Sequence, residues 1–177
     1  KLLEDIYLSS KNSWRIANLR YFNPIGADPD GLIGESPSSE KNNIYPLILD
    51  VASKKLDKFT IFGNDWDTKD GTCVRDYIHV CDVASAHVKV LEKLFTSNKK
   101  KYILNIGLSK GISVLELIKQ FEQANNIKVN YEISNRREGD VEQIYANCKL
   151  AEKELKWFPE RSIKQALIDA WNWEKNN

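Results

Sequence analysis

The sequence predicts an α/β fold in which helices alternate with short strands. Apolar residues recur every three or four positions in several segments, as on one face of a helix, and short runs of β-branched and aromatic residues separate these segments. Because helices connect parallel strands, we expect a mostly parallel or mixed sheet. The 177 residues are 42% hydrophobic, which is enough for one packed core, and neither a repeat nor a linker divides them.

The amino-terminal third predicts a helix, a strand, a long loop and a second helix. Residues 1–11 place four apolar side chains on one helical face, and residues 14–22 form a strand that stops at an Asn-Pro pair. The loop 23–41 contains three prolines and three glycines, as is typical of a binding loop or a disordered one. Asn42 or Asn43 can cap the helix that follows.

The rest of the chain continues this alternation. The predicted strands cover residues 59–63, 102–107 and 128–133, and the predicted helices start at Asp82, Ser113, Asn147 and Ser162. Glu116 and Gln165 lie three residues after serines, which is the spacing of a capping box. The apolar face of the helix that starts at Asp82 includes His87 and Leu91.

Charge, cysteine content and the length of apolar runs argue against several kinds of partner, metal site and membrane segment. With 26 basic and 25 acidic side chains the net charge is +1, so we expect no nucleic acid and no membrane surface as partner. Cys73, Cys81 and Cys148 form no Cys-x-x-Cys pair, which favours neither a disulfide framework nor a zinc site. No apolar run reaches the roughly 20 residues needed to span a bilayer. We therefore expect a cytoplasmic protein.

The start of the sequence favours a fragment over a natural amino terminus. No capping residue precedes the helix expected over residues 1–11, and the sequence contains no methionine. We therefore expect that Lys1 follows a cleavage or that the chain is part of a longer protein.

Three loops concentrate polar residues, and the first two of them lie in the first half of the chain. Asn23 ends a strand, where open α/β sheets bind ligands, although it could instead form an Asx turn before proline. In the loop 70–80, Arg75 offers a planar fork of donors that fits a phosphate, or else forms a surface ion pair with Asp76. We interpret His79 as a hydrogen-bonded structural residue and not as a base.

The third loop, residues 136–140, follows the strand predicted over 128–133. Arg136 and Arg137 could neutralise a diphosphate, and Asp140 could accept from ribose hydroxyls; alternatively the loop is only a charged turn. Two separate arginine loops favour the diphosphate. Since the chain has only two histidines, we expect no metal site.

Taken in order, these stretches resemble the UDP-glucose 4-epimerase family over nearly the whole chain. The residues that carry the resemblance are 19–27, Gly34-Glu35, Asn42-Asn43, 61–63, 70–80, 105–107 and 136–140. Related sugar-nucleotide dehydratases and decarboxylases share the plan but usually lack the Asn-Pro-x-Gly-Ala and Asp-Gly-Thr-x-Val-Arg-Asp-Tyr-Ile-His-Val forms found here.

The resemblance implies a division of the chain and a cofactor. Residues 1–24 would end a Rossmann-type NAD-binding domain, and residues 25–177 would be mainly the smaller UDP-sugar domain, with strand 102–107 returning to the Rossmann sheet. Lys1 would be the catalytic lysine of a Tyr-x-x-x-Lys pair and would also contact NAD, as would Phe22. The parent enzyme would be a homodimer.

The resemblance also implies a set of residues that bind the UDP-sugar substrate. This set is Asn23, Asn43, Ile44, Phe62, Arg75, Tyr77, Arg137, Asp140 and Ile144. Arg75 and Arg137 would clamp the diphosphate, Asp140 would bind ribose, and Phe62 lies in the segment that meets uracil. Ile144 falls where the family varies side-chain size to admit or exclude N-acetylated sugars, and its intermediate size leaves both outcomes open.

The reaction implied by the resemblance interconverts UDP-glucose and UDP-galactose through a 4-keto intermediate, with hydride passing to NAD and back. This chain contains no Gly-x-x-Gly-x-x-Gly sequence, so we expect it to hold the substrate and to be inactive alone. Departures at Asp28, residues 38–41 and Cys73 remove no ligand group. The alternatives are a UDP-sugar dehydratase or decarboxylase, and a catalytically silent module that binds nucleotide sugars.

Overall fold

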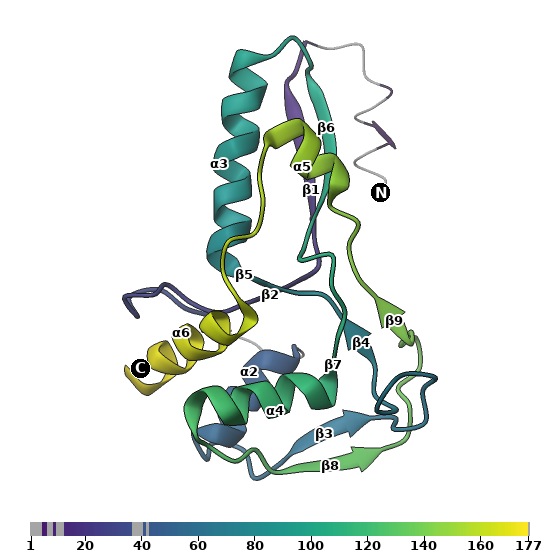
Figure 1. The fold of residues 1–177 in the computed structure, drawn as a ribbon, viewed down its shortest axis with the longest axis vertical. Coiled ribbons are helices and arrows are strands. Elements are labelled where there is room, and N and C mark those ends of the chain that lie inside the picture. Colours follow the sequence, from purple (N-terminus) through teal and green to yellow (C-terminus); the bar gives the residue numbers. More distant parts are fainter. Residues whose placement is uncertain (1–4, 7–8, 10–12, 37–40, 42, 177) are drawn as a thin grey trace.

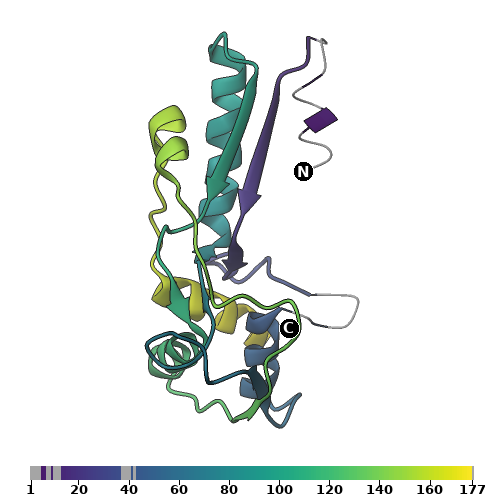
Figure 2. The ribbon, with the colours of Figure 1, turned by 90° about the vertical axis from the view of Figure 1, so that its right-hand side faces the viewer.

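The computed structural model describes residues 5–6, 9, 13–36, 41 and 43–176, and it confirms the α/β class. Two groups of elements occupy the upper and lower halves of Figures 1 and 2, and short strands join them. The elements are β1 (Ile16–Tyr21), β2 (Asn23–Ile25), α2 (Ile44–Ala52), β3 (Phe59–Phe62), β4 (Val74–Arg75), β5 (Tyr77–His79), α3 (Val80–Thr96), β6 (Lys101–Ile106), β7 (Ile112–Ser113), α4 (Val114–Asn125), β8 (Tyr131–Ser134), β9 (Gln143–Ile144), α5 (Lys149–Leu155) and α6 (Ile163–Asn176).

In the upper half, β1 and β6 form a parallel pair that runs beside α3 (Figure 1). Tyr102, Leu104 and Ile106 alternate along β6 and are buried, so one face of this strand packs into the core. Helix α5 covers β6 and contributes Leu155 to the same apolar cluster. The division of the chain at residue 24 stays a prediction.

The lower half is built around α2, α4 and α6, with the parallel pair β3–β8 beside them (Figure 1). Phe121 of α4 lies between Tyr45 and Trp171, with T-shaped ring contacts at 6.3 and 6.1 Å. The capping box predicted at Ser113 and Glu116 is confirmed, because each side chain bonds the other residue's backbone N–H.

Five short strands between the two halves were not predicted. Residues 74–79 provide β4 and β5; β4 pairs with β7 and β9, and β5 pairs in parallel with β2. Each contains only two or three residues, which is too short for an alternating pattern to show. The expected mixed sheet is therefore divided, among the described residues, into four small sheets.

Some of the predicted local features differ from the structure. His87 and Leu91 were expected on the apolar face of their helix but are exposed. The face of α3 that packs into the core carries Val83, Ala86, Val90 and Leu94, and Leu91 belongs to a second apolar stripe that faces outward. Strand β8 starts three residues later than expected. Asn43 occupies the N-cap position of α2 but makes no side-chain capping bond, and Asn42 lies outside the described residues.

The interpretation of His79 as a structural histidine is confirmed. Its side chain is buried, and its Nε2 lies 3.0 Å from Oδ2 of Asp169 on α6. Its Nδ1 accepts the Cys81 backbone N–H at 3.0 Å and thereby caps α3. His79 thus joins α3 of the upper half to α6 of the lower half.

No helix in the described part of the chain is both long and apolar enough to cross a bilayer.

A buried carboxylate joins three segments at the centre of the molecule. Asp76 is fully buried, and its oxygens accept backbone N–H groups of Leu108 at 2.7 Å, Ser109 at 2.9 Å and Ala146 at 3.0 Å. Its own carbonyl accepts the Asn23 N–H at 2.9 Å. Burial raises the pKa of Asp76, and the backbone hydrogen bonds oppose this shift by favouring the ionised form.

Replacing Asp76 by asparagine should lower the stability of the fold. An amide places two N–H donors where the carboxylate only accepts, so at least one backbone N–H loses its acceptor, at a cost of about 1–3 kcal/mol. Urea unfolding followed by circular dichroism measures the free energy of unfolding. The exposed Asp67→Asn variant is the matched control and should change it by less than about 0.5 kcal/mol. Equal unfolding free energies for the two variants would contradict this account of Asp76.

Candidate functional site

A pocket of about 600 Å³ lies where the short central strands meet α2 and β3. Most of the residues predicted to bind a substrate line it, although they come from distant parts of the sequence. The lining residues are Asn23, Lys41, Asn43, Ile44, Leu47, Leu56, Lys58, Phe59, Thr60, Ile61, Phe62, Cys73, Arg75, Tyr77, Val114, Arg137 and Asp140.

Arg75 is held in a fixed place on the pocket wall. It ends β4, and its Nη1 donates to the carbonyl oxygens of Val74 and Val141, both at 2.8 Å. Its Nη2 lies 3.7 Å from Asp140 Oδ1. The side chain is only 18% exposed, so the charge of the guanidinium is poorly screened. The alternative of a surface ion pair with Asp76 is wrong, because the Asp76 carboxylate is bonded to backbone N–H groups.

Arg137 reaches the same pocket from the loop between β8 and β9. Its Nη2 lies 3.0 Å from Asp140 Oδ1, and its guanidinium lies 5.5 Å from the centre of the Phe62 ring. The Phe62 side chain is partly exposed at the end of β3. A flat apolar ring and a planar cation thus share one side of the pocket, an arrangement that can stack a planar ligand.

Arg136, its neighbour, points elsewhere. It bonds Asp65 through Nε at 2.8 Å and lies 4.0 Å over the ring of Trp66. This contact ties the loop after β8 to the loop after β3, and Arg136 does not line the pocket.

Tyr77 supplies a polar group at the back of the pocket. The residue is fully buried in β5, and its hydroxyl makes no hydrogen bond within the described chain. Burial raises the pKa of Tyr77, so the hydroxyl stays protonated and can donate. A buried hydroxyl without a partner costs free energy, and a ligand oxygen within reach would recover that cost.

The amino end of α2 also lines the pocket. Asn43 has extended backbone angles (φ −85°, ψ 143°), and Ile44 starts the helix. The Asn43 amide makes no capping bond and lines the pocket, and Asn23 at the start of β2 offers a second amide. These groups, with Arg75 and Arg137, favour a ligand that is anionic and rich in hydroxyl groups.

Two of the predicted residues that the structure describes do not line this pocket. Phe22 directly follows β1 and donates its N–H to the Ile106 carbonyl at 3.2 Å. Ile144 pairs with Arg75 in the β4–β9 register and is partly exposed. Lys1 lies outside the described residues. Their roles stay predictions.

Several pocket residues were missed by sequence reasoning. Lys58 and Thr60 lie four and two positions before Phe62, so the two-residue period of a strand could have placed all three on one face. Both contact the Glu132 carboxylate on β8. Cys73 also lines the pocket, and burial raises the pKa of its thiol, which therefore stays protonated.

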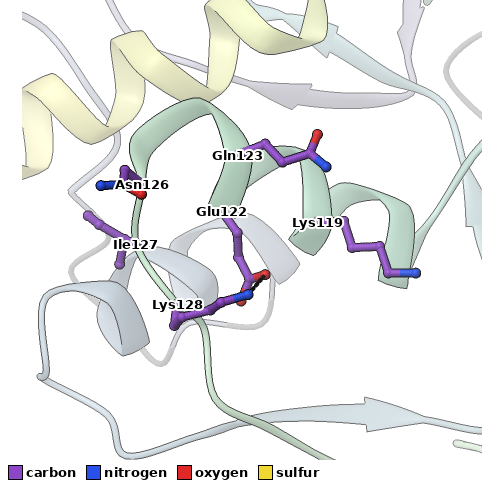
Figure 3. A pocket seen from close by; sticks show the side chains of 6 residues that line it. All are labelled: Lys119, Glu122, Gln123, Asn126, Ile127 and Lys128. Carbon is purple, nitrogen blue, oxygen red and sulfur yellow. Dashed lines mark hydrogen bonds and ion pairs between the residues drawn. The ribbon is translucent and has the colours of Figure 1, made fainter.

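A second pocket of about 460 Å³ lies on the surface of α4 and the turn after it (Figure 3). It is lined by Lys119, Glu122, Gln123, Asn126, Ile127 and Lys128. Glu122 is already bonded to Lys128 Nζ at 2.9 Å and to the Val129 N–H at 3.0 Å. The pocket has neither an arginine nor an aromatic ring, so the chemistry predicted from the sequence belongs to the first pocket. Among the described residues, no three His, Cys, Asp or Glu side chains gather as a metal site.

Curated relatives of this chain are UDP-glucose 4-epimerases. The Haemophilus influenzae protein is 48% identical over 159 residues, which cover 90% of this chain and 47% of that protein. The Bacillus subtilis protein is 44% identical over 177 residues, covering all of this chain and 52% of that protein. The chain therefore spans about half the length of the curated relatives that it matches.

Solved structures of the same enzyme match the fold. A UDP-glucose 4-epimerase from Stenotrophomonas maltophila, bound to NAD and formylated UDP-arabinopyranose, superposes with a TM-score of 0.93 and 42% identity, over 99% of this chain and 52% of that one. The Bifidobacterium longum enzyme in complex with NAD+ and UDP gives 0.91 and 41%, with the same coverage. The family model "NAD dependent epimerase/dehydratase family" matches residues 4–107, more than half of the sequence. The chain belongs to the NAD dependent epimerase/dehydratase family.

Proposed function

We propose that this chain is the substrate-binding part of a UDP-glucose 4-epimerase and that its central pocket binds the UDP-sugar. The observation that carries the proposal is the convergence of Arg75 and Arg137, from two separate loops, on one pocket. Two guanidinium groups in one pocket match the charge of a diphosphate, and the forked donors of arginine fit its oxygens.

The other pocket residues suit the remaining parts of such a ligand. Uracil would stack on Phe62, and the Asp140 carboxylate would accept from the ribose hydroxyls. The hexose would lie toward Asn23, Asn43 and the buried Tyr77 hydroxyl, whose missing partner it would supply. Ile44 would line the sugar end. Ile144, on β9, would be the residue whose size decides whether N-acetylated sugars are admitted or excluded.

The NAD cofactor would contact this chain at one place in the described residues. Phe22 directly follows the carboxyl end of β1, which pairs in parallel with β6, and dinucleotides bind at such strand ends. Its half-buried ring can pack against a nicotinamide or an adenine. When bound, NAD supplies the acceptor for the hydride that leaves the sugar. Lys1 would be the lysine of the catalytic pair, and this chain contains no glycine-rich loop for the cofactor's diphosphate.

The proposal extends to the complete enzyme. It would interconvert UDP-glucose and UDP-galactose in galactose metabolism, act in the cytoplasm and form a homodimer, with no nucleic acid or membrane as partner. Three free cysteines agree with a reducing compartment. The balanced net charge agrees with the absence of polyanionic partners.

Alanine in place of Arg75 or Arg137 should weaken the binding of UDP by ten- to a hundredfold. Each arginine should supply charge-assisted bonds of about 1.5–3 kcal/mol, and about 1.4 kcal/mol corresponds to one decade in affinity. Lysine should restore only part of the loss, because a point charge does not reproduce a two-pronged donor. Titration calorimetry with UDP measures the dissociation constant.

The matched control is Arg15→Ala, which removes an arginine that bonds the carbonyl oxygens of Leu94 and Ser97 away from the pocket. Its dissociation constant for UDP should equal that of the unchanged chain. Unchanged UDP binding in both pocket variants would show that these arginines serve only the loops, and the proposed site would be wrong.

The purified 177-residue chain should bind UDP and yet show no turnover of UDP-galactose. The pocket residues that we assign to the substrate all lie in this sequence, whereas the glycine-rich loop that holds a dinucleotide does not. A coupled assay for UDP-glucose with added NAD tests this expectation. Measurable conversion would show that the sequence contains a cofactor site that we have not identified.

A further inference from the structure

We propose that Asp140 is an internal competitor for the two arginines, so that a diphosphate binds tightly only if it also carries hydroxyl groups that engage the Asp140 carboxylate. The proposal rests on the function proposed above and adds a rule of ligand selection to it. Asp140 would thus reject free diphosphate and accept a nucleoside diphosphate.

One carboxylate oxygen of Asp140 lies close to both guanidinium groups. Oδ1 of Asp140 lies 3.0 Å from Arg137 Nη2 and 3.7 Å from Arg75 Nη2. The Asp140 side chain is 16% exposed and that of Arg75 is 18% exposed, so water screens their attraction less than at an open surface. The carboxylate therefore occupies an Arg137 donor that a phosphate oxygen would use, and it also attracts the charge of Arg75 as an ion pair.

The backbone keeps Asp140 in this position. The Asp140 N–H donates to the Arg137 carbonyl at 3.2 Å, which closes a turn of four residues. Gly139 has φ +84° at the third position, as a type II turn requires. The turn returns the Asp140 side chain to Arg137, so the competing charge is built into the loop.

The remaining donors of Arg75 cannot compensate. Its Nη1 is shared between the carbonyl oxygens of Val74 and Val141, which leaves mainly the Nη2 side for an anion. A bare diphosphate that approaches this side meets the negative charge of Asp140 and has no sugar hydroxyl to donate to it. A ligand with hydroxyl groups donates to the carboxylate while its phosphates take the arginines, so the same residue that repels one ligand stabilises the other.

The test compares inorganic pyrophosphate with UDP on two isosteric variants. Asp140→Asn removes the competing charge, and Glu138→Gln removes one charge from an exposed residue of the same loop. We expect Asp140→Asn to bind pyrophosphate about tenfold more tightly, which corresponds to two weak ion pairs released. UDP should gain nothing or lose affinity, and Glu138→Gln should change pyrophosphate binding by less than about twofold.

Titration calorimetry gives all the dissociation constants, and thermal unfolding establishes that each variant is folded. Asp140→Ser is a second variant that removes the charge and should show the same gain for pyrophosphate. Pyrophosphate binding that is unchanged or weaker in both Asp140 variants would overturn the inference, as would an equal gain for UDP. An unchanged chain that fails to bind UDP would instead remove the proposed function, so the two failures are distinguishable.

Discussion

The buried carboxylate of Asp76 is the interaction on which the binding pocket depends. It accepts N–H groups from the loop after β6 and from the segment before α5, while the Asp76 carbonyl holds the start of β2. The residues on either side of it, Arg75 and Tyr77, both line the pocket. Since a buried charge is tolerated only with its full set of hydrogen bonds, these loops have one arrangement available to them.

The close packing around the Asp76 carboxylate also restricts which residues can stand beside it. A Cβ atom on Gly107 would lie 2.7 Å from Asp76 Oδ2 and 2.7 Å from Ala146 Cβ, so only glycine allows the loop to approach so closely. His79 makes a second connection two residues beyond Tyr77, through Asp169 on α6. The buried polar contacts of Asp76 and His79 therefore fix the segment 75–79. They hold the backbone of the two pocket residues in it, Arg75 and Tyr77, in one place.

The features predicted from the sequence are those with a local cause. The helices follow from apolar spacing, and the box at Ser113 follows from two residues three apart. The short strands β4 and β5 depend on partners more than thirty residues away, and Asp76 gave no local sign that its carboxylate would be buried. Asn23, Arg75 and Arg137 could be proposed for the site from their chemistry and their places in polar loops. Asn43 was proposed only through the family resemblance, and Lys58 needed the pairing of β3 with β8.

The two arginines of the pocket are held in different ways, and this difference bears on how a ligand is bound. Arg75 is mostly buried and bonded to two carbonyl groups, so little side-chain entropy is lost when it meets a phosphate. The Arg137 side chain is 57% exposed and held by Asp140 and the ring of Phe62, both of which a nucleotide would also contact. The proposed nucleotide would therefore replace the Asp140 contacts of both arginines and leave the two carbonyl hydrogen bonds of Arg75 intact. In the proposed complex Arg75 would be a preorganised anchor, and Arg137 would exchange its contacts within the protein for contacts with the ligand.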